Sequence, residues 1–426
     1  EVVKEVFKNK GEMVIKANQA SAKEGNIFVQ KNFADKIVKI VPIKERVKRM
    51  VITGNEAVAL GAISAGLKFY SAYPMTPATS ILHYLAASAE KYNIVVKQPE
   101  DEIGAINQTV GASFAGARAM TATSGGGFCL MTEGFGMAGI TETPIVVVES
   151  MRGGPASGMP TWSGQGDLKF VINASQDEFP RIILAPGDAE ECFKLTRKAF
   201  HLAEKYQLPV LILLDKNISE SYYSNIPFKT KYNNQRYSFI KPKKNFLRYK
   251  ITKSGISPRC FLGEKNGCHL CNSYEHDEYG LVTEEIGERI SMMNKRKRKF
   301  NLLKKDILKQ EIFGHEKAKT SIISWGSNKG PILEALNAKN AKTKREIKSR
   351  ETLNYLHLNL LWPFPIKQVK KFIQSANKIV CLECNSTGQL ASLIKEQAGI
   401  GVNSLLKYDG RPFYPNEIIK KIGGKI

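Results

Sequence analysis

The segment that decides the fold reads RAMTATSGGGFCLMTEGFGMAGITETPIVVVES and spans residues 118–150. It starts with a short strand-like run and passes through three glycines at 125–127 into an apolar stretch. That stretch ends near Gly139, and the segment finishes with the strand-like run PIVVVES. Apolar strands with helices between them are typical of a parallel sheet that helices cover on both faces. The segment therefore predicts a βαβ unit.

The same alternation continues on both sides of this unit. Further helices are expected over 54–66, 77–92, 102–117 and 188–206, and further strands over 67–73, 93–98, 181–186 and 208–215. A second alternating block resumes at Thr320. We predict the α/β fold class, with a parallel-sheet domain followed by a smaller α/β domain. In such sheets the ligand site lies at the carboxyl ends of the strands, near helix N-termini.

This pattern divides the chain into four parts. Residues 1–47 indicate a helical tail and linker, 48–235 the first α/β domain, 236–316 an extended basic connection, and 317–426 the second α/β domain. The chain begins at Glu1 in the middle of a helical pattern. We therefore expect the first part to be the end of a preceding domain.

Composition limits the class of protein. Hydrophobic residues make up 42% of the 426 residues, which is enough for a sizeable core. No apolar run approaches the roughly 20 residues that a transmembrane helix needs. The seven cysteines are an odd number, and no signal peptide is visible, which suits a reducing compartment. We expect a soluble, cytoplasmic protein without a membrane span.

The net charge of +23 is concentrated in three basic segments, at 241–244, 294–299 and 337–351. Solvated surface charge is the favoured interpretation of these segments. The alternatives are an acidic protein partner and nucleic acid, since excess positive charge attracts both. No aromatic residues interleave with the basic runs, so nucleic acid is disfavoured.

Two CxxC pairs, Cys268–Cys271 and Cys381–Cys384, raise the question of a zinc site. Far more residues separate the two pairs than in a zinc ribbon. Ordinary thiols are therefore favoured, and no metal ligands are predicted in this chain.

Three turns at the predicted ligand edge carry polar side chains. The run YPMTP (73–77) is expected to place Thr76 at the N-cap of a helix and Pro77 at its first position. Such a helix start suits a carboxylate or phosphate, although Thr76 could simply cap its own helix.

The next two turns contribute an acid and an arginine. In QPEDEIGA (98–105) three acids stand between a strand and a helix, where they either stabilise the helix N-terminus or provide a buried carboxylate for a heterocyclic nitrogen. Arg152 follows a strand beside glycines, and its guanidinium suits a keto-acid carboxylate or simply the surface. The glycines of TSGGGF (123–128) allow close approach of backbone N–H groups to a ligand. If the fold is correct, these turns converge on one site.

Taken together, these elements resemble the α subunit of 2-oxoacid:ferredoxin oxidoreductases. YPMTP, the stretch from EDEIGA to GGGFCLM, GGPASGMPT, YEHDEYG, GQLA and KYDGRPF occur in the family's order. The resemblance covers about 48–426, and residues 5–25 resemble the end of the γ-type domain that is fused ahead of α in many members. Met75 stands where the family has isoleucine, and Ala156–Ser157 where Ser–Thr is expected.

The resemblance implies thiamine diphosphate chemistry on a thiamine-type (pyrimidine-binding) domain followed by a transketolase-C-terminal-like domain. Glu102 would hydrogen-bond N1′ of the aminopyrimidine, and Thr76 and Arg152 would hold the substrate carboxylate. Tyr73, Pro74, Ser124 and Gly125 would complete the cofactor pocket. The reaction would be oxidative decarboxylation of a 2-oxoacid with CoA to acyl-CoA and CO₂, with electrons passed to ferredoxin.

The resemblance also implies a partner. The chain lacks the Gly-Asp-Gly pattern of a metal–diphosphate site and any four-cysteine cluster motif. Diphosphate, Mg²⁺ and a 4Fe–4S cluster are therefore expected on a β subunit. The γ–α order favours 2-oxoglutarate, and the alternatives are a pyruvate or branched-chain 2-oxoacid enzyme and a non-catalytic scaffold subunit.

Overall fold

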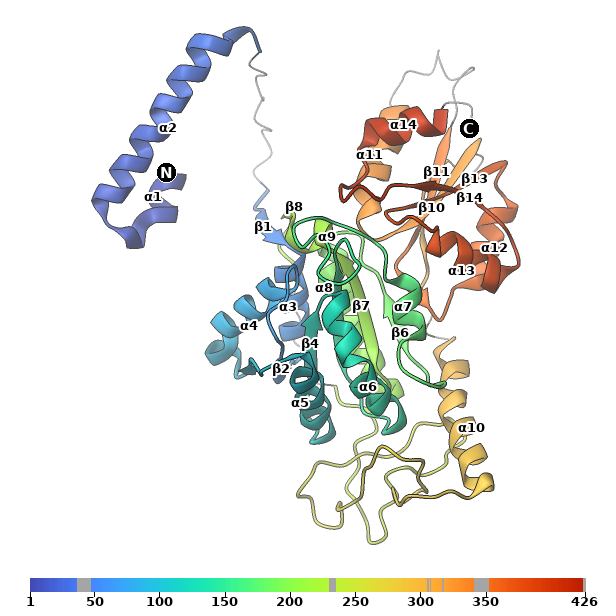
Figure 1. Cartoon of the computed structure of the whole chain (residues 1–426). Helices are drawn as coiled ribbons and strands as arrows, with labels where there is room; N and C mark the ends of the chain where they lie inside the picture. Colours follow the sequence, from blue (N-terminus) through green and yellow to red (C-terminus); the bar gives the residue numbers. More distant parts are fainter. Residues whose placement is uncertain are drawn as a thin grey trace. The chain divides into compact units, whose positions relative to one another are not determined.

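The computed structural model describes residues 1–36, 47–229, 235–304, 306, 308–315, 318–340 and 352–423. Two compact units make up the chain, Glu1–Lys48 and Arg49–Ile426, and each is described by itself (Figure 1). Within the described ranges, no helix combines the length and the apolar composition needed to cross a bilayer.

The described residues of the first unit are largely helical. Helix α1 (Val2–Phe7) and helix α2 (Glu12–Phe33) are separated by a 3₁₀ turn, Lys8–Lys10, with Gly11 at a φ of +89° before α2. Neither helix contains a buried residue. These two helices therefore form no core between them, and the origin of the unit as the end of a γ-type domain stays a prediction.

The larger unit is built around a seven-stranded sheet in the order β12-β6-β7-β5-β4-β2-β3. Strand β12 runs antiparallel to β6, and the other neighbouring strands are parallel. The strands are β2 (Phe69–Ser71), β3 (Val95–Lys97), β4 (Ala119–Thr123), β5 (Val146–Met151), β6 (Ile182–Leu184), β7 (Val210–Asp215) and β12 (Leu360–Trp362). The parallel sheet that the apolar runs predict is confirmed.

Helices cover both faces of this sheet, because successive side chains of a strand point to opposite faces. Val146 and Val148 of β5 pack in one hydrophobic cluster with α3 (Gly54–Ser64), α4 (Thr79–Tyr92) and α8 (Ala189–Tyr206). Val147 and Met151 pack in a second cluster with α5 (Glu102–Phe114), α6 (Gly125–Ile140) and α7 (Leu168–Asn173).

A five-stranded sheet forms the second α/β domain, in the order β14-β13-β10-β11-β9. Its elements are β9 (Glu311–Gly314), β10 (Thr320–Trp325), α11 (Lys329–Asn340), β11 (Leu353–Leu358), α12 (Ile366–Gln374), β13 (Lys378–Glu383), α13 (Gln389–Ala398), β14 (Asn403–Leu406) and α14 (Pro415–Gly423). Two short strands, β1 (Met50–Thr53) and β8 (Tyr222–Asn225), pair antiparallel apart from both large sheets, and α9 (Lys216–Glu220) precedes β8.

The sequence predicts an extended connection between the domains, but part of this connection is helical. It contains helix α10 (Ile286–Leu303), whose basic run was expected to be solvated. Lys295 and Lys299 are instead buried against the carboxylate of Glu142, with Lys295 Nζ 2.6 Å from Glu142 Oε1. Burial lowers the pKa of Lys299 to about 7. These lysines can be buried because their counter-charge is a buried carboxylate that lies more than 150 residues earlier in the chain. Most of the basic segment 337–351 lies outside the described residues.

The two large sheets are joined through buried polar contacts. The side chain of Gln165, which is fully buried, donates to Asp215 Oδ2 and to the carbonyl of Trp325, both at 3.2 Å. Its amide oxygen accepts from Asn328 Nδ2 at 2.9 Å and from Cys384 N at 3.0 Å. Gln165 therefore ties the loop after β5 to the carboxyl ends of β10 and β13.

A second joint centres on Glu191 at the start of α8. Its carboxylate accepts from Lys329 Nζ at 2.6 Å and lies 2.9 Å from Nε2 of His357, both in the second domain. Burial raises the pKa of Glu191, but the bonds from His357 and Lys329 outweigh it, so the pKa is lowered to about 2. The joint therefore depends on an ionised carboxylate.

This joint makes the stability of the protein pH-dependent. The folded pKa of Glu191 lies below its ordinary value of 4.5. Its contribution is therefore present above about pH 4.5 and lost as pH falls toward 2. A shift of this size corresponds to about 3 kcal/mol. Glu191→Gln should lower the free energy of unfolding at pH 7 and flatten its decline below pH 4.5, as measured by urea unfolding across pH.

The exposed neighbour Glu190 provides the matched control, because its contact with Lys194 is a surface ion pair. Glu190→Gln should keep the wild-type pH profile. If the free energy of unfolding declined equally below pH 4.5 in Glu191→Gln and wild type, the contact of Glu191 with Lys329 and His357 would not determine stability in acid.

Candidate functional site

Parallel strands β2, β4 and β5 are neighbours in the sheet, so the loops that follow them open on one edge. Arg152, at the end of β5, donates from Nη1 to the backbone carbonyl of Thr76, in the loop after β2, at 2.8 Å. The Sδ atom of Met75 in that loop lies 3.8 Å from Thr123 Oγ1, at the end of β4. These two contacts bring the three loops together.

Thr76 does not cap a helix, so that prediction is wrong. Helix α4 begins at Thr79, and its N-cap residue, Ala78, makes no side-chain capping bond. The chain instead turns over Met75–Ala78, with Ala78 N donating to Met75 O at 2.9 Å. The carbonyl of Pro77 accepts a hydrogen bond from the buried amide of Asn55 at 2.7 Å. This bond to α3 holds Thr76 in a loop, where its side chain is exposed.

Tyr73 and Pro74, which were predicted to shape the pocket, lie in the same loop as Thr76. Tyr73 is exposed and Pro74 is half-buried. Their role in shaping a cofactor pocket stays a prediction.

The acids at 100–102 separate into different roles. Asp101 is the N-cap of α5 and accepts a hydrogen bond from Gly104 N at 2.7 Å, so it stabilises the helix start. Glu100 is exposed. Glu102 is only 4% exposed, and its Oε1 atom has no hydrogen-bond partner among the described residues. Burying a carboxylate oxygen without a partner is unfavourable, which indicates that a ligand supplies the partner.

The glycine turn before α6 faces this carboxylate. An added Cβ on Gly127 would lie 2.6 Å from Glu102 Oε1 and closer still to Thr123 Oγ1. An added Cβ on Gly125 would lie 2.5 Å from Asp167 Oδ2. The N-cap residue Ser124 is fully buried, and its hydroxyl has no partner among the described residues either. The first turn of α6 thus leaves room for Glu102 and offers a second unsatisfied polar atom.

Sequence reasoning missed a carboxyl pair beneath this turn. Glu149 on β5 is fully buried, and it stands opposite Thr123 in the register of the sheet. Burial raises the pKa of Glu149 well above its ordinary value, and the neighbouring carboxyl of Asp167 raises it further. Burial also raises the pKa of Asp167. Both carboxyl oxygens of Glu149 lack a hydrogen-bond partner among the described residues, so Glu149 is a second buried acid without a partner near Glu102. The signal in the sequence was an acid inside the apolar run PIVVVES.

Metal ligation finds no support in the described part of the chain. No group of three His, Cys, Asp or Glu side chains there could hold a metal ion. All seven cysteines are free thiols.

Because the missing Cβ of Gly127 makes room for Glu102, Gly127→Ala should crowd the site. The overpacking is expected to lower the free energy of unfolding by about 1–3 kcal/mol. Gly126→Ala in the same turn is the matched control, because its added Cβ would meet only the carbonyl of Ala156 at 3.9 Å. That change should be neutral or stabilise by up to about 1 kcal/mol. Urea unfolding measures both, and equal stability of the two variants would contradict this packing.

Comparison with known proteins gives consistent results. The family model described as "Pyruvate flavodoxin/ferredoxin oxidoreductase, thiamine diP-bdg" matches residues 60–295. The α subunit of 2-oxoacid:ferredoxin oxidoreductase 1 from Sulfurisphaera tokodaii is 36% identical, over 98% of this chain and 67% of the relative. The chain spans 61% of the corresponding Saccharolobus solfataricus subunit, which is 37% identical.

Shorter relatives are matched over almost their whole length. The 2-oxoglutarate synthase subunit KorA of Methanothermobacter thermautotrophicus is 33% identical, over 87% of this chain and 97% of the relative.

The fold is also found in a solved structure. The 2-oxoglutarate:ferredoxin oxidoreductase of Magnetococcus marinus, with 2-oxoglutarate, coenzyme A and succinyl-CoA bound, superposes with a TM-score of 0.91. The two are 33% identical, and the match covers 99% of this chain and 73% of the other. With a matching family model over more than half of its length and these relatives, the chain belongs to the family of 2-oxoacid:ferredoxin oxidoreductase α subunits.

Proposed function

We propose that this chain is the α subunit of a thiamine diphosphate-dependent 2-oxoacid:ferredoxin oxidoreductase. Its complex would decarboxylate a 2-oxoacid oxidatively with CoA and pass electrons to ferredoxin. The observation that carries the proposal is the buried, unpartnered Oε1 of Glu102 beside Gly127, at the carboxyl edge of a parallel sheet. The match to a thiamine diphosphate-binding family model supports it.

The residues around Glu102 fit an aminopyrimidine. Glu102 Oε1 and Ser124 Oγ are both buried and lack partners among the described residues, so each can form a hydrogen bond to a polar ring atom. Glu102 Oε1 and Thr123 Oγ1 both border the space that Gly127 leaves open, and Met75 Sδ lies 3.8 Å from Thr123 Oγ1. When bound, thiamine diphosphate supplies the electron sink for decarboxylation of a 2-oxoacid. The part of Glu102 is to hold a hydrogen bond to the ring nitrogen in a site from which water is largely excluded.

Arg152 and Thr76 are proposed to bind the substrate carboxylate. Nη1 of Arg152 donates to Thr76 O, and a guanidinium carries five N–H donors in a planar fork. The contact orients the fork at the mouth of the loop, and its other donors suit a carboxylate in bidentate geometry. The exposed hydroxyl of Thr76 can add one further hydrogen bond.

The substrate is proposed to be 2-oxoglutarate. Relatives named 2-oxoglutarate synthase subunits and the solved complex with 2-oxoglutarate favour it over pyruvate and branched-chain 2-oxoacids. A β subunit is proposed to hold the diphosphate, Mg²⁺ and a 4Fe–4S cluster, since the described residues offer no metal site. The complex would therefore be active only when α and β are combined.

Glu102→Gln is expected to lower kcat/KM by about 100-fold or more, because an amide cannot replace the carboxylate that the ring nitrogen requires. The assay is dye reduction by the chain co-expressed with its β subunit, with CoA and a panel of 2-oxoacids. Glu100→Gln, two residues away on an exposed side chain, is the control and should keep wild-type turnover. Unchanged turnover in Glu102→Gln would favour a scaffold subunit without a catalytic role.

A further inference from the structure

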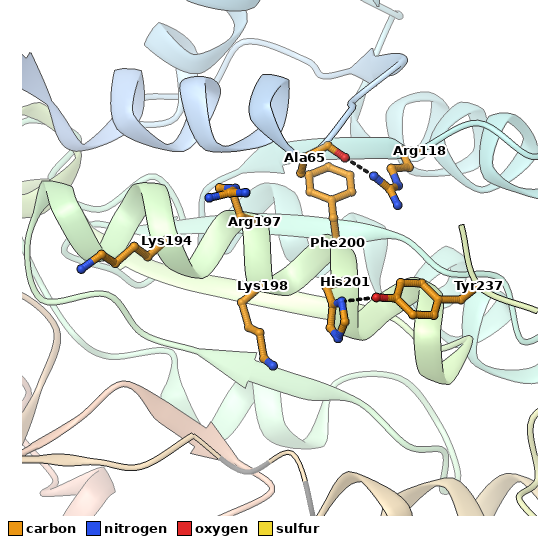
Figure 2. Close-up of a pocket in the computed structure, with 8 residues that line it drawn as sticks. All are labelled: Ala65, Arg118, Lys194, Arg197, Lys198, Phe200, His201 and Tyr237. Carbon is orange, nitrogen blue, oxygen red and sulfur yellow. Dashed lines mark hydrogen bonds between the residues drawn. The ribbon is translucent and has the colours of Figure 1, made fainter. Parts of the chain in front are cut away.

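A cavity of about 270 Å³ with several basic residues in its lining lies away from the proposed thiamine site. Arg118, which lines it, directly precedes β4, whereas Ser124 of the thiamine site directly follows that strand. The cavity therefore lies at the amino edge of the parallel sheet and the thiamine site at the carboxyl edge. Figure 2 shows its lining, to which α8 contributes most of the side chains.

The α8 side of the cavity is a basic face. Lys194, Arg197, Lys198 and His201 follow one another at helical spacings of three, one and three residues, which places them on the same side of the helix. Their charged ends point in different directions around α8, and Arg118 and Tyr237 contribute to the lining from other parts of the chain (Figure 2). The opposite side of α8 packs in the hydrophobic core through Cys192, Leu195 and Ala199.

Positive charge around this cavity exceeds negative charge among the described side chains. Beneath it, the buried carboxylate of Glu204 is shared by three arginines, which are Arg118 at 2.7 Å, Arg236 at 2.5 Å and Arg259 at 3.7 Å. Lys194 pairs with Glu190 at 2.6 Å, but both side chains are mostly exposed, so that pair is weak. Glu204 therefore cannot neutralise the basic groups around it.

The excess of positive charge affects the pKa of His201, which lines the cavity. His201 Nδ1 lies 2.6 Å from the hydroxyl of Tyr237, and this contact fixes the orientation of the ring. Burial lowers the pKa of His201, and the positive charges of Lys198 and Lys205 lower it further. Likewise, burial lowers the pKa of Arg259 to about 9, and the nearby Arg248 adds to the effect. An anion bound in the cavity would offset the positive charge beside His201, which lines it, whereas Arg259 is not a lining residue.

We propose that this cavity is a binding site for a diphosphate group, either free or carried by a nucleotide. Four cationic side chains line it, three from α8 and Arg118 from the loop before β4, which suits a multiply charged anion better than a single carboxylate. Because the site lies at the opposite edge of the sheet, it is distinct from the place proposed for thiamine diphosphate. The inference goes beyond the proposed function and does not depend on it.

The test is calorimetric titration of the full chain with inorganic pyrophosphate at low ionic strength. The double variant Lys194→Gln/Lys198→Gln should weaken binding at least tenfold, since each lost charge-assisted contact is worth about tenfold or more. The control is Lys370→Gln/Lys395→Gln, which removes the same charge from exposed positions on α12 and α13 and should leave the affinity unchanged.

Each outcome decides the proposal. Absence of pyrophosphate binding at millimolar concentration would overturn the proposal. Equal weakening of binding in both double variants would also overturn it, because general attraction to the +23 chain would then explain the binding. Titration with ADP separates the two sources: tighter binding than pyrophosphate indicates a nucleotide, and weaker binding indicates a free diphosphate. If circular dichroism shows that the double variant is unfolded, Lys198→Gln alone carries the same comparison.

Discussion

The buried, unpartnered Oε1 atom of Glu102 is the feature on which the rest of the proposed site depends. It is buried at the start of α5, and two neighbouring elements leave it room: β4 ends in the small side chain of Thr123, and α6 begins with glycines. A buried carboxylate oxygen without a partner is unfavourable unless a ligand satisfies it. The parallel order of β2, β4 and β5 brings the loop of Thr76 and the side chain of Arg152 to the same edge.

Much of this arrangement can be read from the sequence, because it follows from local rules. Solid apolar runs separated by helical patterns indicate a covered parallel sheet, and the carboxyl edge of such a sheet is where ligands bind. For Asp101 the alternative of an acid that stabilises the helix N-terminus is correct, since it caps α5. For its neighbour Glu102, burial and the unpartnered Oε1 favour the functional alternative, which stays a proposal.

The features that could not be predicted depend on partners far away in the chain. The basic run in α10 reads as solvated charge, yet Lys295 and Lys299 are buried because Glu142 faces them. The sequence pattern predicts that Thr76 caps a helix. The hydrogen bond from Asn55 to Pro77 O instead holds this segment as a loop, and α4 starts only at Thr79. Strand β12 lies between elements of the second domain in the sequence but pairs with β6 of the first sheet, and no local sequence pattern predicts this pairing. The carboxyl pair of Glu149 and Asp167 likewise needs three-dimensional proximity.

The central claim is that Glu102 activates a bound aminopyrimidine, and the most direct measurement is the exchange of the C2 proton of thiamine diphosphate for deuterium. Exchange is followed by acid quench and NMR in the complex reconstituted with the β subunit, without substrate, so no later step of turnover contributes. The account predicts that Glu102→Gln slows exchange by about 100-fold or more at equal cofactor occupancy. Equal exchange rates in the variant and the wild type would contradict it.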